Sequence, residues 1–164
     1  MNNKPRRIDK IMAYSAYCDG ACRVSNPGIT SCAWVIYEGE REVKHQAYFL
    51  GSELHTNNYA EFQGLIKLLE HLHSAHIKDV VIYCDSALVV NTVNGIWTPN
   101  KPDISKMCAY ATGLMTVGYH RLIHIKGHDG IAGNEEADRL CNEELDRQEE
   151  HVKTMGSNNK QTQS

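Results

Sequence analysis

The spacing of apolar residues changes twice along this chain. Three short segments, 13–18, 30–37 and 42–50, are separated by turn residues and predict an antiparallel meander of three strands. After Asn58 the spacing becomes that of one helical face. The residues on that face are Phe62, Leu65, Ile66, Leu69 and Leu72. A meander followed by an amphipathic helix already points to an α/β architecture.

The second change comes at residues 79–84 (DVVIYC), a nearly continuous apolar run that ends at Asp85. Such a run is typical of a strand covered on both faces, and the helix before it favours parallel pairing with an earlier strand. The remaining pattern predicts helices at 86–95, 103–117 and 134–148, a strand at 119–126 and a loop at 127–133. The whole order predicts a mixed sheet with helices on both faces.

The length of 164 residues corresponds to one domain. We assign residues 13–149 to the folded domain, residues 1–12 to a flexible basic N-terminal segment and residues 150–164 to a disordered polar tail. The net charge is −3, with the acidic excess gathered in 134–150. This balance excludes a protein that holds nucleic acid by bulk positive charge.

Targeting and redox signals are weak. No apolar run approaches the roughly 18 residues of a membrane-spanning helix, and the N-terminus lacks the apolar stretch of a signal peptide. We therefore expect a cytoplasmic protein that does not bind membranes. None of the six cysteines has Cys-x-x-Cys spacing, and several lie in apolar runs, so we predict buried free thiols rather than disulfides or zinc ligands.

Four carboxylates stand at informative places: Asp19 and Asp85 near strand ends, and Glu61 and Asp138 near helix starts. Each has a structural alternative. Asn58 and Glu61 have the spacing of a capping box, Asp138 could complement a helix N-terminus, and the other two could be turn residues.

Taken together, the four acids favour a metal site. If the first and fourth strands are neighbours in the sheet, Asp19 and Asp85 lie side by side and repel each other. A divalent cation removes that repulsion, and Mg²⁺ prefers oxygen ligands. Four carboxylates could hold two ions about 4 Å apart, an arrangement suited to phosphoryl displacement.

Four blocks of sequence carry a family resemblance: YCDGAC with NPG (17–28), TNNYAE (56–61), IYCDS (82–86) and KGHDGIAGNEEAD (126–138). Over roughly residues 13–145 they resemble type 1 ribonuclease H, in the family's order and spacing. The resemblance implies the ribonuclease H-like fold, a five-stranded mixed sheet flanked by helices. It also implies a metal-dependent endonuclease that hydrolyses the RNA strand of RNA/DNA hybrids and leaves 5′-phosphate and 3′-hydroxyl ends.

The same resemblance implies roles for individual residues. Asp19, Glu61, Asp85 and Asp138 would bind two Mg²⁺ ions, with Mn²⁺ as the alternative, and His128 would assist proton transfer or product departure. The implied partner is an RNA/DNA hybrid, bound by a monomer. The substrate-binding candidates are Gly20, Ala21, Cys22, Asn26, Thr56, Asn57, Ser86 and Asn134.

Two other functions stay open: a hybrid-binding domain without catalysis, and a related nuclease that acts on DNA. The intact acids argue against the first, and the TNN and GHDG blocks against the second. The chain also departs from the commoner family pattern in its longer loop at 22–28. Residues 97–107 lack a Lys/Arg/Trp-rich protrusion, so we expect weak, salt-sensitive binding unless basic residues of 1–12 compensate.

Overall fold

The computed structural model describes residues 13–161, so the predicted basic segment 1–12 lies outside the described residues. A single five-stranded sheet organises the fold, in the order β3-β2-β1-β4-β5. This arrangement confirms the predicted five-stranded mixed sheet. The strands are β1 (Tyr14–Arg23), β2 (Ile29–Glu38), β3 (Arg41–Phe49), β4 (Val81–Cys84) and β5 (Arg121–His124).

The two halves of the sheet pair differently. β1, β2 and β3 form the predicted antiparallel meander, whereas β4 pairs in parallel with both β1 and β5. In the β1–β4 register Cys18 lies opposite Cys84. The next residues, Asp19 inside β1 and Asp85 directly after β4, therefore lie side by side.

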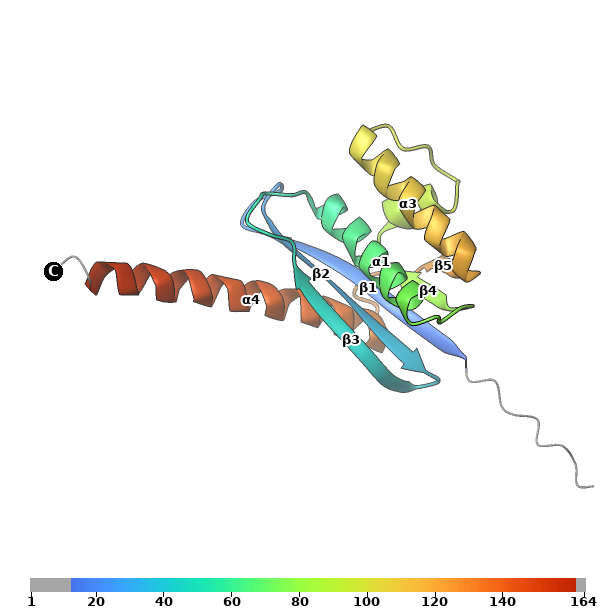
Figure 1. The fold of residues 1–164 in the computed structure, drawn as a ribbon, viewed down its shortest axis with the longest axis horizontal. Coiled ribbons are helices and arrows are strands. Elements are labelled where there is room, and N and C mark those ends of the chain that lie inside the picture. The colour runs from blue at the N-terminus through green and yellow to red at the C-terminus, as the bar shows by residue number, and fades with distance from the viewer. Residues whose placement is uncertain (1–12, 162–164) are drawn as a thin grey trace, which may run out of the picture.

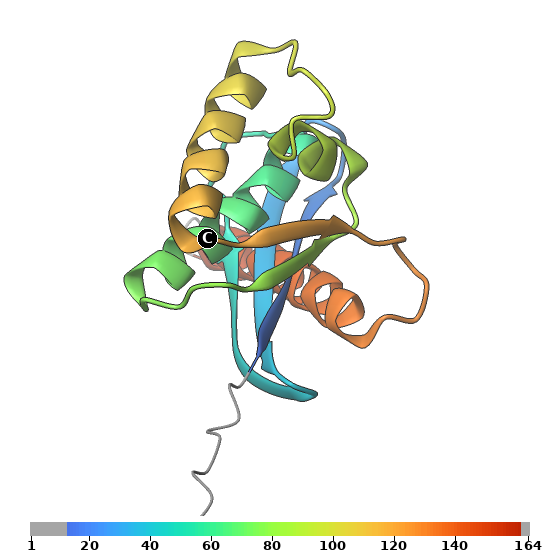
Figure 2. The same cartoon turned by 90° about the vertical axis from the view of Figure 1, so that its right-hand side faces the viewer.

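Helices cover both faces of the sheet (Figures 1 and 2). On one face α1 (Asn57–Ser74) packs on β1 and β2, and α3 (Pro102–Gly118) packs on α1 beside the short α2 (Ala87–Val93). On the other face α4 (Ala132–Gln161) crosses β1, β2 and β3. The main apolar core fills the α1 side, and a smaller cluster of Ala33, Leu140 and Cys141 lies beneath α4.

Several boundaries differ from those predicted. β1 does not stop at Asp19 but continues to Arg23, because β2 pairs with it as far as the Arg23–Ile29 pair. β5 covers only Arg121–His124 of the predicted 119–126. These are the places where a neighbouring strand, rather than the local pattern, decides the length of pairing.

The largest difference concerns the C-terminal segment. Residues 150–161, predicted to be part of a disordered tail, continue α4 as a helix, which projects past the sheet in Figure 1. Side chains 151–158 are exposed, so this stretch does not pack on the domain. Apolar residues recur at helical spacing where a helix packs on the rest of the protein, so a helix that does not pack shows no such pattern in the sequence. Within this stretch Thr154 Oγ1 donates a hydrogen bond to the Glu150 carbonyl oxygen at 3.0 Å.

Two further expectations can be compared with the described residues. All six cysteines are free, and all but Cys22 are buried, as predicted. Among residues 13–161, no helix combines the length and apolar character needed to cross a membrane.

Candidate active site

Three of the four predicted acids converge where β4 ends beside the middle of β1. Asp19 lies within β1, Glu61 lies in α1, and Asp85 directly follows β4. Each offers a carboxylate oxygen within 4.8 Å of the other two. Asp19 is 4% exposed and Glu61 6% exposed, while Asp85 is half-buried. The site is therefore a compact, largely desolvated group of oxygen donors.

Two glycines allow α1 to approach β1 this closely. A Cβ on Gly20 would lie 2.3 Å from the carbonyl carbon of Ala60, and one on Gly64 would lie 2.5 Å from the Asp19 carbonyl oxygen. No side chain fits at either place. Gly20 was singled out in the sequence, but Gly64 was not, although a glycine inside a helix is itself a signal of close packing.

The position of Glu61 excludes the capping-box alternative. The N-cap of α1 is Thr56, whose Oγ1 accepts a hydrogen bond from the Tyr59 backbone N–H at 3.1 Å. Glu61 consequently lies in the second helical turn and points towards β1. Its Oε2 atom is buried and has no hydrogen-bond partner among the described residues. An orphaned carboxylate oxygen beside two other carboxylates fits a bound cation.

Burial and mutual repulsion disfavour the charged forms of these acids. Burial, followed by the charge of Asp85, raises the pKa of Asp19 from its ordinary value of 3.8 to about 8. Burial and the charge of Asp19 likewise raise the pKa of Glu61 well above its usual range. In residues 13–161, none of the observed ion pairs includes any of the three acids. The donor set thus lacks a positive partner and suits a hard divalent cation.

Asp138 lies beside this group rather than within it. It occupies the second turn of α4, is half-buried, and does not belong to the set of three closely spaced acids. Its charge nevertheless contributes to the raised pKa of Asp19. Asn142 Nδ2 donates to the Asp138 carbonyl oxygen at 3.0 Å, within α4.

Asp85 is held by three neighbours. Asn134, predicted as a substrate contact, is only 4% exposed, and its Nδ2 donates to Asp85 Oδ2 at 3.2 Å. His124 Nε2 donates to the Asp85 carbonyl at 3.2 Å, and a Cβ on Gly127 would lie 3.0 Å from Asp85 Oδ2. His124 was not predicted. It ends β5 next to β4, a placement that depends on sheet order and so leaves no sequence motif.

His128 lies in the loop between β5 and α4. The residue is exposed and has a left-handed backbone conformation, with φ of 56°. Gly127, which contacts Asp85 closely, directly precedes it. The imidazole is therefore carried on a loop anchored beside the acids but is itself open to solvent.

The predicted substrate-binding residues fall into two groups. The loop after β1 and the start of α1 meet where Asn26 Oδ1 accepts the Asn57 backbone N–H at 3.0 Å, and both side chains are exposed. Cys22 is half-buried, with Sγ 3.0 Å from the Ser25 carbonyl oxygen. Ala21 is partly exposed, whereas Gly20 is buried against α1.

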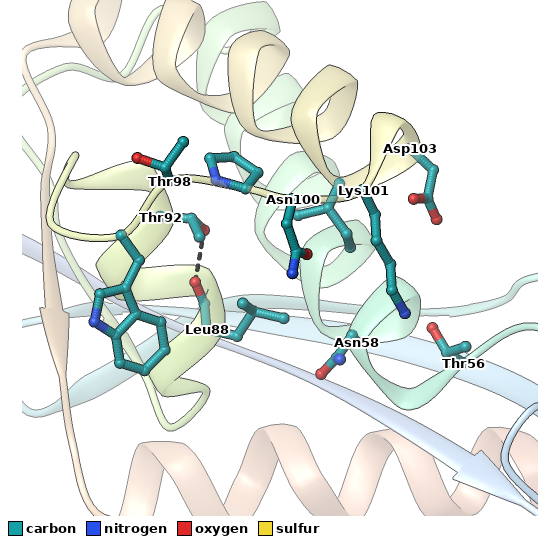
Figure 3. A pocket seen from close by; sticks show the side chains of 11 residues that line it. Thr56, Asn58, Leu88, Thr92, Thr98, Asn100, Lys101 and Asp103 are labelled. Carbon is teal, nitrogen blue, oxygen red and sulfur yellow. Dashed lines mark hydrogen bonds between the residues drawn. The ribbon is translucent and has the colours of Figure 1, made fainter.

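Ser86 caps α2, where its Oγ accepts the Val89 N–H at 3.3 Å. Thr56 and Asn58 border a hollow of about 460 Å³ between α1, α2 and the loop 94–101 (Figure 3). Lys101 extends along this hollow towards Thr56. Residues 94–101 connect α2 directly to α3.

Comparison with known proteins gives a consistent result. Residues 12–146 match the model of the RNase H family. Ribonuclease HI of Halobacterium salinarum is 35% identical over 135 residues, which cover 80% of this chain and 63% of that protein. The chain thus spans less than two thirds of that relative. Ribonuclease H of Francisella tularensis subsp. novicida is 34% identical over 143 residues, covering 79% of this chain and 89% of that protein.

Solved structures show the same architecture. The crystal structure of RNase H1 from Halobacterium salinarum superposes with a TM-score of 0.73 at 34% identity, covering 82% of this chain and 98% of that chain. LC11-RNase H1, crystallised in complex with an RNA/DNA hybrid, gives a TM-score of 0.70 at 26% identity. That match covers 79% of this chain and 94% of the other.

Proposed function

The chain belongs to the RNase H family, and from that premise we propose that it is an endoribonuclease that hydrolyses the RNA strand of RNA/DNA hybrids. The proposed reaction uses two Mg²⁺ ions and leaves 5′-phosphate and 3′-hydroxyl ends. The observation that carries the proposal is the convergence of Asp19, Glu61 and Asp85 within 4.8 Å, with a buried Glu61 oxygen left unpaired.

Asp19, Glu61 and Asp85 would hold the metal, and Asp138 would complete the set from α4. Bound Mg²⁺ supplies Lewis-acid activation of a water and neutralises charge on the scissile phosphate. The chain's own contribution is preorganisation. Gly20 and Gly64 fix Asp19 against Glu61, and Asn134 restrains the Asp85 carboxylate. Burial strengthens the repulsion between the ionised acids, so a bound cation stabilises the site most when all of them are ionised.

His128 is proposed to move protons or to help product leave. An exposed imidazole on a loop suits this role, because an imidazole ring can both give and accept a proton. Its neighbour Gly127 places the start of the loop against Asp85. His128 would therefore assist the reaction without belonging to the metal-binding set.

Substrate recognition is proposed to occur where β1 and α1 meet. Distinguishing RNA from DNA requires polar groups that reach the 2′-hydroxyl. Asn26 and Asn57 are exposed and joined to each other, on the loop after β1 and at the start of α1, the two elements that carry Asp19 and Glu61. Ala21 and Cys22 lie near the end of β1, just before that loop. Thr56 would bind a phosphate of the DNA strand, and Lys101 supplies a positive charge in the same hollow. We propose that the protein acts as a monomer in the cytoplasm.

A cleavage assay tests this function. End-labelled RNA/DNA hybrid, duplex DNA and duplex RNA are each incubated with the full chain in Mg²⁺, Mn²⁺ or EDTA. We expect metal-dependent cutting of the hybrid's RNA strand alone, with 5′-phosphate ends detected by phosphatase treatment. Cleavage of DNA would instead support the related-nuclease alternative. Hybrid binding without cleavage would support the non-catalytic alternative.

A further inference from the structure

Arg23, the last residue of β1, connects that strand to the middle of α4. Its Nη1 donates to Asp146 Oδ1 at 2.6 Å and to Glu149 Oε1 at 3.4 Å. Its Nη2 donates to both the carbonyl oxygen and Oδ1 of Asn142, at 3.2 and 3.1 Å. The Arg23 side chain is 27% exposed. Both ends of the guanidinium fork are thus bound by α4, an arrangement that lysine could not reproduce.

The loop that begins immediately after Arg23 reaches the substrate-binding residues proposed above. The Arg23–Ile29 pair closes loop 24–28. Within it, Asn26 bonds the first residue of α1, and Gly28 exchanges two backbone hydrogen bonds with His55, both 2.9 Å. One side of the loop is therefore joined to the start of α1, and Arg23 joins the other side to α4.

The loop contains a strained residue next to this anchor. Val24 has φ of 79°, a left-handed conformation that glycine adopts easily and β-branched residues rarely adopt. Its side chain is exposed, so packing of that side chain does not impose the conformation. Strained backbone persists only where the surrounding contacts hold it, and such strain is concentrated at functional sites. Val24 lies between Arg23, which is bound to α4, and Ser25, whose carbonyl oxygen is 3.0 Å from Cys22 Sγ.

We propose that Arg23 is a positioning residue for the hybrid: its bonds to α4 hold loop 24–28 in the conformation that presents Asn26. This inference rests on the proposed function. A direct contact between Arg23 and a substrate phosphate is disfavoured, because Asp146 and Glu149 already compensate the guanidinium charge. The middle of α4, from Asn142 to Glu149, thereby acquires a role in substrate binding, although it lies beyond the metal-binding residues.

The first test compares Arg23→Ala and Arg23→Lys with the wild-type full chain in steady-state cleavage of the hybrid. We expect KM to rise about tenfold in Arg23→Ala, with kcat unchanged within about twofold. The dependence of kcat on Mg²⁺ should not change. In Arg23→Lys, KM should lie between the values of the wild type and Arg23→Ala. Arg147→Ala is the matched control: within residues 13–161 Arg147 forms its ion pair with Glu144 of the same helix, so its removal should leave KM unchanged.

The second test distinguishes loop positioning from general stability. Val24→Gly removes the strain, so the loop depends less on its anchor. Adding Val24→Gly to Arg23→Ala should therefore return KM to within about threefold of the wild type. An unchanged KM in Arg23→Ala, a loss confined to kcat, or strictly additive effects in the double variant would overturn the inference while leaving the proposed function intact. Failure of the wild-type chain to cleave the hybrid would overturn both.

Discussion

At the scale of single residues, Asp85 is the one of the three converging acids whose charge can be removed with least disturbance, since it is only half-buried. Asp85→Asn should abolish cleavage, because the amide is a poor ligand for a divalent cation. Without metal, the melting temperature should stay equal or rise, since repulsion with Asp19 is relieved. Asp79→Asn, at an exposed left-handed position, is the control and should keep full activity. A clear loss of metal-free stability in Asp85→Asn would favour a purely structural role.

The raised pKa of Asp19 predicts that the metal-free protein loses stability as the pH rises. Because its folded-state pKa of about 8 lies above its ordinary 3.8, folding favours the protonated form. The stabilisation is complete below about pH 4 and is lost as the pH rises towards 8. In EDTA, the melting temperature should fall by about 5 °C or more between pH 5 and pH 8. The fall should be smaller in Asp19→Asn and in the wild type with Mg²⁺. A metal-free stability that rises over this range would contradict the prediction.

His128→Ala should slow turnover without abolishing it. Loss of a positioned proton-transfer group lowers the reaction rate by about a hundredfold or more. The metal-binding acids remain in place in this variant, so activity is not abolished. We expect kcat to fall at least about tenfold, with hybrid binding unchanged when measured in Ca²⁺. His151→Ala, in the exposed part of α4, is a suitable control. A wild-type kcat in His128→Ala would remove its proposed role.

At the scale of secondary-structure elements, the close contact between α1 and β1 assembles the site. Gly64 tests this contact, because it lies in α1 against β1. Gly64→Ala would place a methyl group 2.5 Å from the Asp19 carbonyl oxygen, so α1 must move away from β1. We expect a loss of about 2–3 kcal/mol in the free energy of unfolding, with impaired cleavage.

Gly113→Ala provides the matched comparison. Gly113 lies inside α3, and a Cβ there would meet nothing within 4 Å. The same substitution should therefore stabilise the protein by about 1 kcal/mol through helix propensity alone. Urea unfolding of both variants checks the pair. Equal effects at the two positions would show that the α1–β1 approach is not as tight as the structure indicates.

The helices and strands themselves were largely predictable from local pattern. The face of α1 and the buried run of β4 follow from apolar spacing, and both were found close to their predicted ranges. Boundaries were less predictable. β1 extends to Arg23 because of β2, and α4 extends to Gln161 without apolar contacts to reveal it.

At the scale of the whole molecule, the net charge of −3 implies that the hybrid is held through few phosphate contacts. KM should rise several-fold between about 50 and 200 mM NaCl, with kcat little changed. Replacing Lys4, Arg6, Arg7 and Lys10 with alanine should weaken binding and reduce this salt dependence. If the four substitutions leave the salt dependence unchanged, the N-terminal segment does not contact the hybrid.

The sequence by itself determined the order of the elements and the identity of the acids. Apolar periodicity is a local property, and an acid at the end of an apolar run is visible without knowing its neighbours. The parallel pairing that sets Asp19 beside Asp85 was also inferable, because a helical crossover precedes the fourth strand.

Only the tertiary structure decided which of these residues meet. It brought Glu61 to Asp19 through Gly64, left Asp138 at the margin, and turned Asn134 inward onto Asp85. It also joined Arg23 to a part of α4 more than a hundred residues away in the chain. Such contacts depend on how helices and sheet pack in three dimensions, and packing distances are not encoded in any single stretch of sequence.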